Sequence, residues 1–317
     1  MIKISRIRSL WRWTLCLSLL CPLQLAAAPA QEGETVIVDN AFKSLRPAIF
    51  RRPFQRIPDQ GERPFWTDPT GESPELQFDP QRTIFGDEVL WIDPMTYGKV
   101  AMARAERMSA VAALVTPERL ETAIRDAIAR ADGVAEGPAS RIVFAREAGK
   151  AQVAQVLAGR DSGNAMVVQG PVFASHLPDP GAVQLSWDDR QVVITLRLQR
   201  FRKVRGKHMS IRDLGPLTFY HYVGAPVPEG VDPVAYWTRN DGAPLLAALR
   251  EGFERIVRTA RSPLPEGAPP APGATSVVMV GDRLQQFPGT VIERGEGVAL
   301  LRLAKAEFVL VATGTGE

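Results

Sequence analysis

Both cysteines of this chain, Cys16 and Cys21, lie within its first 30 residues. Those 30 residues begin with basic side chains, continue through an apolar stretch and end on the small residues APA, which is the pattern of a secretory signal peptide. We therefore expect cleavage near Ala30 and a periplasmic or otherwise extracytoplasmic location. The remaining chain would contain no cysteine, so its fold has to rest on a hydrophobic core without disulfides.

The apolar stretch of the signal covers residues 13–25, which is short of the about 20 apolar residues that span a bilayer. We therefore expect no transmembrane segment in the mature chain. The alternative to cleavage is lipid attachment at Cys21, which would anchor the protein. Leu19 and Leu20 precede that cysteine where a lipoprotein signal normally has a small residue, so we favour cleavage.

Removal of the signal also changes the charge balance. The whole chain has 38 Lys and Arg against 35 Asp and Glu, a net charge of +3. Four of the basic residues and none of the acidic ones lie in the signal, which leaves 34 basic against 35 acidic residues. The overall charge therefore gives no argument for nucleic-acid binding, and a basic binding surface has to be local.

Residues 31–85 have the composition of an extended arm. Prolines recur at positions 47, 53, 58, 64, 69, 74 and 80, a spacing that excludes a long helix. Residues 36–38 (VIV) suit a short strand, and basic and aromatic side chains alternate through the rest of the arm. Two interpretations stay open: an arm that lies over its own domain, or a docking segment for a partner.

Residues 86–261 are expected to form the main domain. Apolar periodicity predicts helices near residues 117–133, 152–157 and 245–260, with Asp241 as a cap for the last one. Apolar runs predict strands near residues 89–92, 141–144, 166–173, 183–187, 192–204 and 219–222. The apolar alternation slips between Leu198 and Phe201, which indicates a β-bulge.

A proline-rich linker over residues 262–275 and a small β-meander over residues 276–317 complete the predicted organisation. The fold class is therefore α/β in the broad sense (α+β): a mixed sheet with packed helices, an N-terminal arm and a C-terminal meander.

Residues 116–207 carry the order helix, strand, helix, strand, strand, long strand. The segments AMVVQG at 165–170 and VITLRL at 193–198, running toward Gly206-Lys207, resemble an α/β domain of envelope proteins. That domain occurs in the curli-secretion lipoprotein, in lipoprotein activators of penicillin-binding proteins and at the N-terminus of Tol translocation protein B. The resemblance implies an assembly or scaffold role rather than catalysis, although this chain lacks a good lipidation site and adds the arm and the meander.

Known catalytic motifs do not fit the chain well. Ser162 lies in an RDSG segment, but no histidine precedes it and it is not in a G-x-S-x-G turn. A hydrolase that uses Ser162 with His176 or His221 therefore remains only an alternative. The three histidines have no metal-binding spacing, and no dinucleotide motif is present, so we expect neither a metal nor a cofactor.

Two groups of residues are candidate binding sites. The first is a run of basic residues at the end of the long strand: Arg197, Arg200, Arg202, Lys203, Arg205 and Lys207. Such a run suits phosphate-bearing lipid, another anionic envelope component or an acidic protein. The second is aromatic, with polar edges that suit a recognition surface or the packing of a sheet: Tyr220, His221, Tyr222 and Trp237. We therefore expect an exported, non-enzymatic protein that binds a partner protein or envelope component.

Overall fold

The computed structural model describes residues 33–40, 46–47, 55–56, 77–84, 87–91, 102–103, 105–134, 138–170, 182–186, 188–204, 210–263, 267–271, 274–281, 283–295 and 297–313. All of them lie in one unit, Glu32–Glu317. The predicted signal with Cys21, the basic residues Arg205 and Lys207, and His176 lie outside the described residues.

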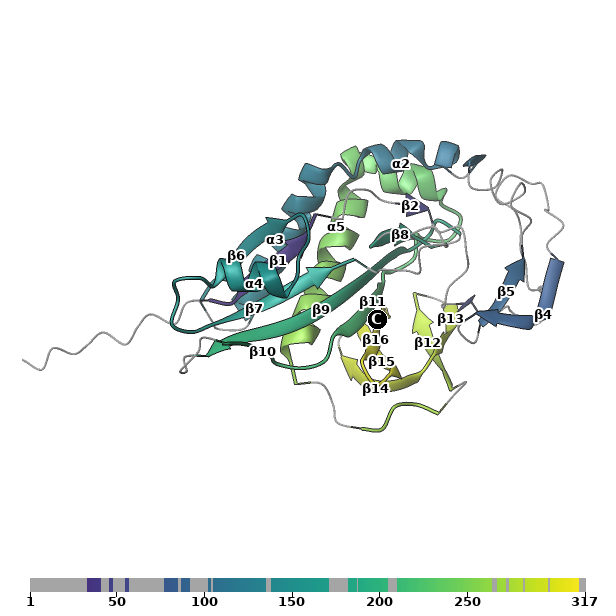
Figure 1. Ribbon diagram of the computed structural model, residues 1–317. Helices are drawn as coiled ribbons and strands as arrows, with labels where there is room; N and C mark the ends of the chain where they lie inside the picture. The colour runs from purple at the N-terminus through teal and green to yellow at the C-terminus, as the bar shows by residue number, and fades with distance from the viewer. Residues whose placement is uncertain are drawn as a thin grey trace, which may run out of the picture. The chain divides into compact units, whose positions relative to one another are not determined.

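A mixed sheet, 11-stranded over the described residues, forms the centre of the fold (Figure 1). Its main order is β14 (Thr290–Gly295), β15 (Val298–Ala304), β16 (Glu307–Ala312), β11 (Thr218–Val223), β9 (Val192–Val204), β7 (Gly163–Gln169), β1 (Thr35–Asp39) and β6 (Arg141–Ala145). Three further strands extend it: β10 (Ser210–Asp213) and β8 (Val183–Leu185) both pair with β9, and β2 (Arg46–Pro47) pairs with β8. The fold class predicted from the sequence is confirmed.

Parallel and antiparallel pairs alternate in blocks across this sheet. β1 pairs in parallel with β6 and with β7, and β11 pairs in parallel with β16. β9 pairs antiparallel with both β7 and β11 and so joins the two parallel blocks. The long strand predicted over residues 192–204 is therefore the central strand of the whole sheet.

The predicted bulge in β9 is wrong. The register from Gly163↔Lys203 to Gln169↔Arg197 runs without a shift. Leu198 faces the apolar cluster on one side of the sheet, whereas Phe201 faces a different cluster on the other side. The strand is regular, but apolar residues cover one of its faces at Leu198 and the opposite face at Phe201. The apolar alternation in the sequence therefore slips without a bulge.

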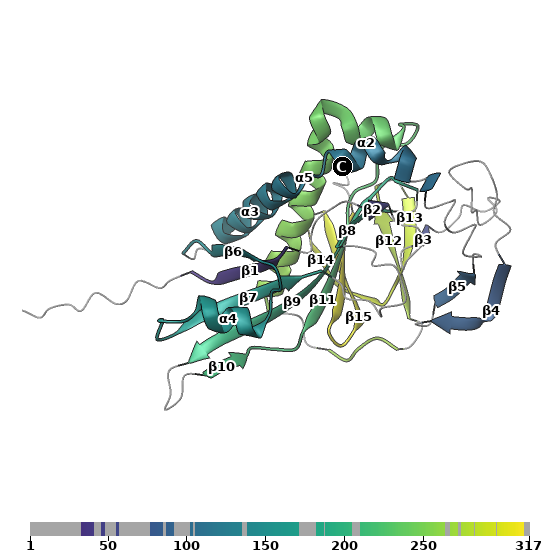
Figure 2. The same ribbon diagram turned by 45° about the horizontal axis from the view of Figure 1, so that its top comes forward.

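The helices lie on both faces of the sheet. α2 (Ser109–Ala113), α3 (Pro117–Val134) and α5 (Pro233–Arg261) cover one face, which holds the largest apolar cluster. α4 (Lys150–Val156) covers part of the opposite face, where Val153 and Leu157 pack against Ile37 of β1. Figure 2 shows α3 and α5 on the far side of the strands from α4. None of the described helices is long and apolar enough to cross a membrane.

Helix α5 is bent near its first third. Asn240, Asp241 and Gly242 all have positive φ values, of 51°, 56° and 81°, so the helical hydrogen bonding restarts after them. Asp241 was predicted to cap the following helix; its carboxylate forms an ion pair with Arg119 of α3. The bend therefore coincides with a polar link between α5 and α3.

The C-terminal strands belong to two sheets. β14, β15 and β16 form an antiparallel meander that continues the main sheet through β16 and β11. β12 (Thr275–Val280) and β13 (Arg283–Pro288), with β3 (Gln55–Arg56), form a separate three-stranded sheet. Val278, Val280 and Phe287 of this small sheet pack against the second face of the main sheet. Periodicity had not predicted β13.

Segments assigned to the N-terminal arm contribute strands to both sheets. Val36 and Val38 of β1 are fully buried in the main core, so residues 35–39 are an interior strand rather than part of the arm. β2 pairs with β8, and β3 pairs with β13 at Gln285 and Gln286. The strand predicted near residues 89–92 is β5 (Asp87–Trp91), which pairs with β4 (Gln77–Ile84) in a hairpin and not with the main sheet.

Candidate functional site

The described basic residues of β9 lie on both faces of the sheet, because side chains alternate along a strand. Arg200 and Arg202 share the face of Leu198, which α3 and α5 cover farther along the strand. Arg197 and Lys203 share the face of Phe201, which packs with α4. The basic run in the sequence is therefore not one basic surface in the structure.

Two of these cations bind backbone carbonyl groups. Lys203 is only 6% exposed, and its Nζ donates to the carbonyl oxygen of Leu157, at the end of α4, over 2.6 Å. Arg197 donates through Nε to the carbonyl oxygen of Gly170 at 2.9 Å. Burial is the main reason that the pKa of Arg197 falls below its ordinary value. Both side chains tie β9 to neighbouring segments.

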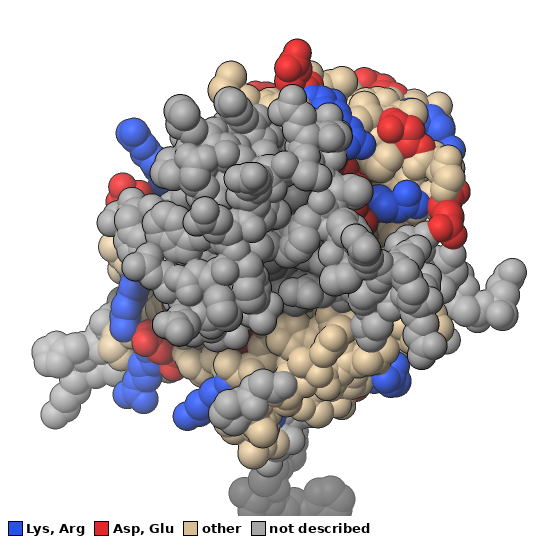
Figure 3. Space-filling view, turned by 90° about the vertical axis from the view of Figure 1, so that its right-hand side faces the viewer, with Lys and Arg blue, Asp and Glu red and all other residues tan. Residues whose placement is uncertain are grey.

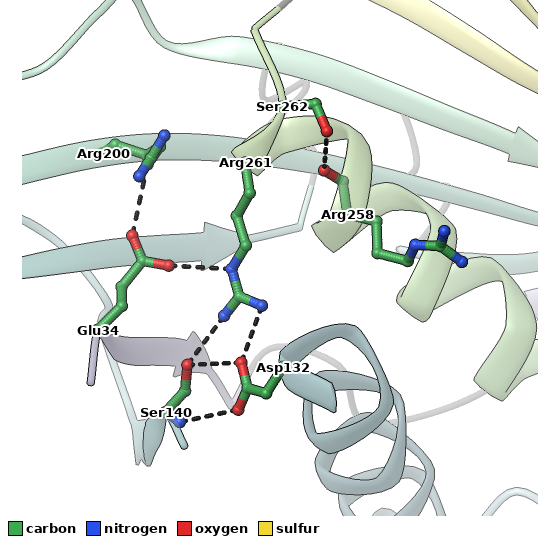
Figure 4. Close-up of polar contacts among 7 residues, drawn as sticks. All are labelled: Glu34, Asp132, Ser140, Arg200, Arg258, Arg261 and Ser262. Carbon is green, nitrogen blue, oxygen red and sulfur yellow. Dashed lines mark hydrogen bonds and ion pairs between the residues drawn. The ribbon is translucent and has the colours of Figure 1, made fainter. Parts of the chain in front are cut away.

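Arg200 belongs to a closed polar network at the end of α5 (Figure 4). Its Nε lies 3.4 Å from Oε1 of Glu34, and Oε2 of Glu34 accepts from Nε of Arg261 at 3.1 Å. The Arg261 guanidinium also lies 2.9 Å from both Asp132 Oδ1 and Ser140 Oγ. Arg261, Glu34 and Asp132 have side chains 12–15% exposed, so this network joins α3, α5 and the start of β1 in a largely dry environment.

Among the basic residues of β9, all of which the structure describes, Arg202 is the one classed as exposed. It pairs directly with Arg212 of β10 in the antiparallel register, and Arg212 is exposed as well. Nε of Arg202 donates to Oδ1 of Asn164 on β7 at 3.2 Å. Directly opposed like charges destabilise a strand pair. In Figure 2 the paired ends of β9 and β10 lie at the lower left, at the end of the sheet away from β12 and β13.

The aromatic group is mainly core. Tyr220, Tyr222 and Trp237 are 3%, 0% and 2% exposed and all pack in the large apolar cluster. Tyr220 stacks on Phe308 of β16, with ring centroids 5.8 Å apart. Trp237 donates through its indole nitrogen to the backbone oxygen of Asp189 at 2.7 Å. Burial raises the pKa of Tyr220 to about 12 and raises that of Tyr222 as well.

His221 points to the other face of the sheet, where three adjacent strands bring polar side chains together. Its Nδ1 lies 3.1 Å from Oγ1 of Thr195 on β9, and its Nε2 lies 3.0 Å from Oε1 of Glu307 on β16. The hydrogen bond from His221 lowers the pKa of the Glu307 carboxyl, against the opposing effect of partial burial. A hydroxyl, an imidazole and a carboxylate in this order can transfer a proton.

Ser162 is far from this group. It precedes Gly163, which pairs with Lys203, whereas His221 pairs with Thr195, eight residues earlier on β9. That separation is roughly 26 Å along the strand at about 3.3 Å per residue. Ser162 and His221 therefore cannot form the hydrogen-bonded pair that a hydrolase requires.

Sequence reasoning missed Arg212, Thr195 and Glu307. Each acquires its role from a cross-strand neighbour that is distant in the sequence, since Glu307 is 86 residues from His221. The alternation in residues 192–199 does mark Thr195 as facing away from the apolar side. Among the described residues, no group of three or more His, Cys, Asp or Glu side chains is placed to hold a metal ion.

No protein-family model matches this chain, and none of the curated proteins matches it in sequence.

Proposed function

We propose that this protein is an exported envelope protein that binds an anionic envelope component through the end of the β9–β10 hairpin. The observation that carries the proposal is the exposed, directly opposed pair Arg202 and Arg212. Because the two residues are directly opposed, their side chains project from the same face of the β9–β10 pair, and one anionic ligand can attract both guanidinium groups. The predicted signal supports an extracytoplasmic location for this interaction.

The distribution of the other charges supports a local rather than a general attraction. Figure 3 shows basic and acidic side chains interspersed over the described part of the opposite end of the molecule. The near-neutral balance of the chain after the predicted signal agrees with this mixture. A membrane or polyanion would then meet the protein in one orientation, with the hairpin toward it.

Capture from cell envelopes tests the proposal. The double variant Arg202→Ser, Arg212→Ser should lose capture of its anionic target, with an unchanged circular dichroism spectrum. Arg130→Ser with Arg294→Ser is the matched control, because both arginines are exposed and lie on other elements. If the wild type and the hairpin variant capture the target equally well, the hairpin is not the binding surface.

A second candidate function follows from the His221 group. An esterase would use the Thr195 hydroxyl as nucleophile, His221 as the base that takes its proton, and Glu307 to orient the imidazole. His221→Gln should then lower hydrolysis of p-nitrophenyl acetate by at least about 100-fold. Wild-type protein that hydrolyses this ester no faster than His221→Gln contradicts the esterase.

A further inference from the structure

Three turns meet beside the small sheet and form a pocket. They are the turn before β9, the loop between β11 and α5, and the turn between β12 and β13. The cavity measures about 330 Å³, which is at the lower end of the range for small-ligand sites. This pocket is separate from the hairpin and from the His221 group, and the inference does not depend on the proposed function.

The pocket walls are held by hydrogen bonds and by the close approach of the Gly281 backbone to Pro226. The amide of Val227 donates to the backbone oxygen of Arg190 at 2.7 Å. Nη2 of Arg190 in turn donates to the carbonyl oxygens of Val227 and Pro228 at 2.5 and 2.6 Å. Gly281 has a φ of 62°, and a Cβ there would lie 3.1 Å from Cγ of Pro226. The walls are therefore formed before any ligand binds, which reduces the entropic cost of binding.

Two buried amides belong to the pocket lining. Gln191 and Gln285 are 6% and 8% exposed. Nε2 of Gln285 donates to Oε1 of Gln191 at 3.3 Å, and Nε2 of Gln191 donates to the carbonyl of Gly224 at 3.1 Å. Oε1 of Gln285 accepts no hydrogen bond from a described residue. This oxygen is accessible from the pocket, and an N–H group of a ligand can donate to it.

The charged side chains that line the pocket restrict the charge of a ligand that can bind there. Nε and Nη1 of Arg190 form no hydrogen bond to a described residue and can bind a carboxylate. Asp188 and Glu229 also line the pocket and disfavour a ligand with a second negative charge. Ala225 and Pro226 supply an apolar wall. The matching ligand has one carboxylate, an adjacent amide N–H and a small apolar side chain.

We propose that this pocket binds the C-terminal end of a short peptide. The free carboxylate contacts Arg190, the last amide N–H donates to Gln285, and the last side chain packs against Ala225 and Pro226. Capture of a terminal carboxylate is a recurring mode of peptide recognition. A free amine on the same peptide, near Asp188, would complete the charge match.

The test is titration of the purified protein with the dipeptide Ala-Ala, followed by nuclear magnetic resonance of the glutamine side-chain amides. We expect saturable shifts at Gln191 and Gln285, with a Kd on the order of a millimolar for so small a ligand. The C-terminal amide of the same dipeptide should bind at least about tenfold more weakly. This comparison uses the wild-type protein with two ligands, so its result does not depend on whether a variant folds.

Variants of two neighbouring glutamines locate the site. Gln285→Met should weaken binding about tenfold, since it removes the amide at similar volume. Gln286→Met is the control, because Gln286 is exposed on the opposite face of β13 and bonds Thr275. No shift at about ten times the expected Kd, equal binding of the amidated dipeptide, or equal effects of the two variants would each overturn the proposal.

Discussion

Arg202 and Lys203 are adjacent in the sequence but have different surroundings. Arg202 is exposed on the hairpin, whereas Lys203 is buried and donates to the Leu157 carbonyl. Lys203→Ser should lower the free energy of unfolding by about 1–3 kcal/mol, because it leaves that carbonyl without its donor. Arg202→Ser should change it by no more than about 0.5 kcal/mol. Urea unfolding measures both, and equal losses would contradict the assignment.

The Glu307 carboxyl predicts a pH dependence of stability. Its pKa in the folded protein is lowered by the hydrogen bond from His221, so the ionised carboxylate stabilises the fold. That contribution is present above the unfolded pKa, of about 4.3, and is lost as the pH falls through the lower folded value. Glu307→Gln should therefore lose less stability than the wild type between pH 5 and pH 3, as measured by thermal unfolding; parallel curves would contradict this.

Tyr220 makes the corresponding prediction at alkaline pH. Burial raises its pKa to about 12 in the folded protein. The raised value means that the stabilisation is complete below the unfolded pKa, of about 10, and is lost as the pH rises through the folded one. Tyr220→Phe should reduce the fall in stability over this alkaline range, seen by urea unfolding at a series of pH values. An unchanged slope would mean that the phenol is accessible to solvent.

At the residue scale, the sequence shows which side chains are apolar or basic, but it does not show which neighbours surround them in the fold. The alternation of Ile194, Leu196 and Leu198 correctly indicates one buried face of β9. It does not indicate that α4 covers the opposite face at Phe201, because α4 precedes β9 by more than 30 residues. Because the sequence does not reveal that α4 packs on Phe201, it led to two incorrect expectations: a bulge in β9 and a single basic surface.

At the scale of elements, helix α5 fits closely against the sheet at Gly252. A Cβ at Gly252 would lie 2.5 Å from Cδ1 of Tyr222 and 2.6 Å from Cδ1 of Ile194. Gly252→Ala should therefore destabilise the protein by about 1–3 kcal/mol despite the higher helix propensity of alanine. Gly133→Ala in α3 is the control, because nothing lies within 4 Å of its added Cβ. Urea unfolding should show that this control is neutral or stabilising; a stable Gly252→Ala variant would contradict the packing.

Local signals predicted most of these elements. Thr116, Pro117 and Glu118 mark the start of α3, where Oγ1 of Thr116 accepts from the amide of Arg119. β13 escaped prediction because its sequence, RLQQFP, has two adjacent glutamines in the middle and no apolar alternation, and because Gln285 is buried whereas Leu284 is exposed. Gln285 faces inward, where a strand usually has an apolar residue. It lines the pocket, and a polar side chain suits that position.

At the scale of the whole molecule, the sequence gives little sign of which strands share a sheet. The proline-rich segment before β12 predicts a linker to a separate C-terminal part, yet β16 pairs with β11 along five residues. Phe308 and Leu310 also pack in the large apolar cluster. A fragment that ends at residue 261 should therefore lack cooperative urea unfolding, since it exposes the edge of β11 and this part of the core. A fragment that unfolds with the wild-type midpoint would contradict the integrated sheet.

We propose that the β9–β10 hairpin, and not the rest of the surface, binds anionic envelope components. The most direct measurement is sedimentation of the purified protein with phosphatidylglycerol vesicles and with purely zwitterionic phosphatidylcholine vesicles. The account predicts binding to the anionic vesicles only, and a partition coefficient roughly 30-fold lower for Arg202→Ser, Arg212→Ser, at about 1 kcal/mol per arginine. The control Arg130→Ser, Arg294→Ser should bind as the wild type does. Equal binding to the two kinds of vesicle, or equal losses in the two double variants, would contradict the account.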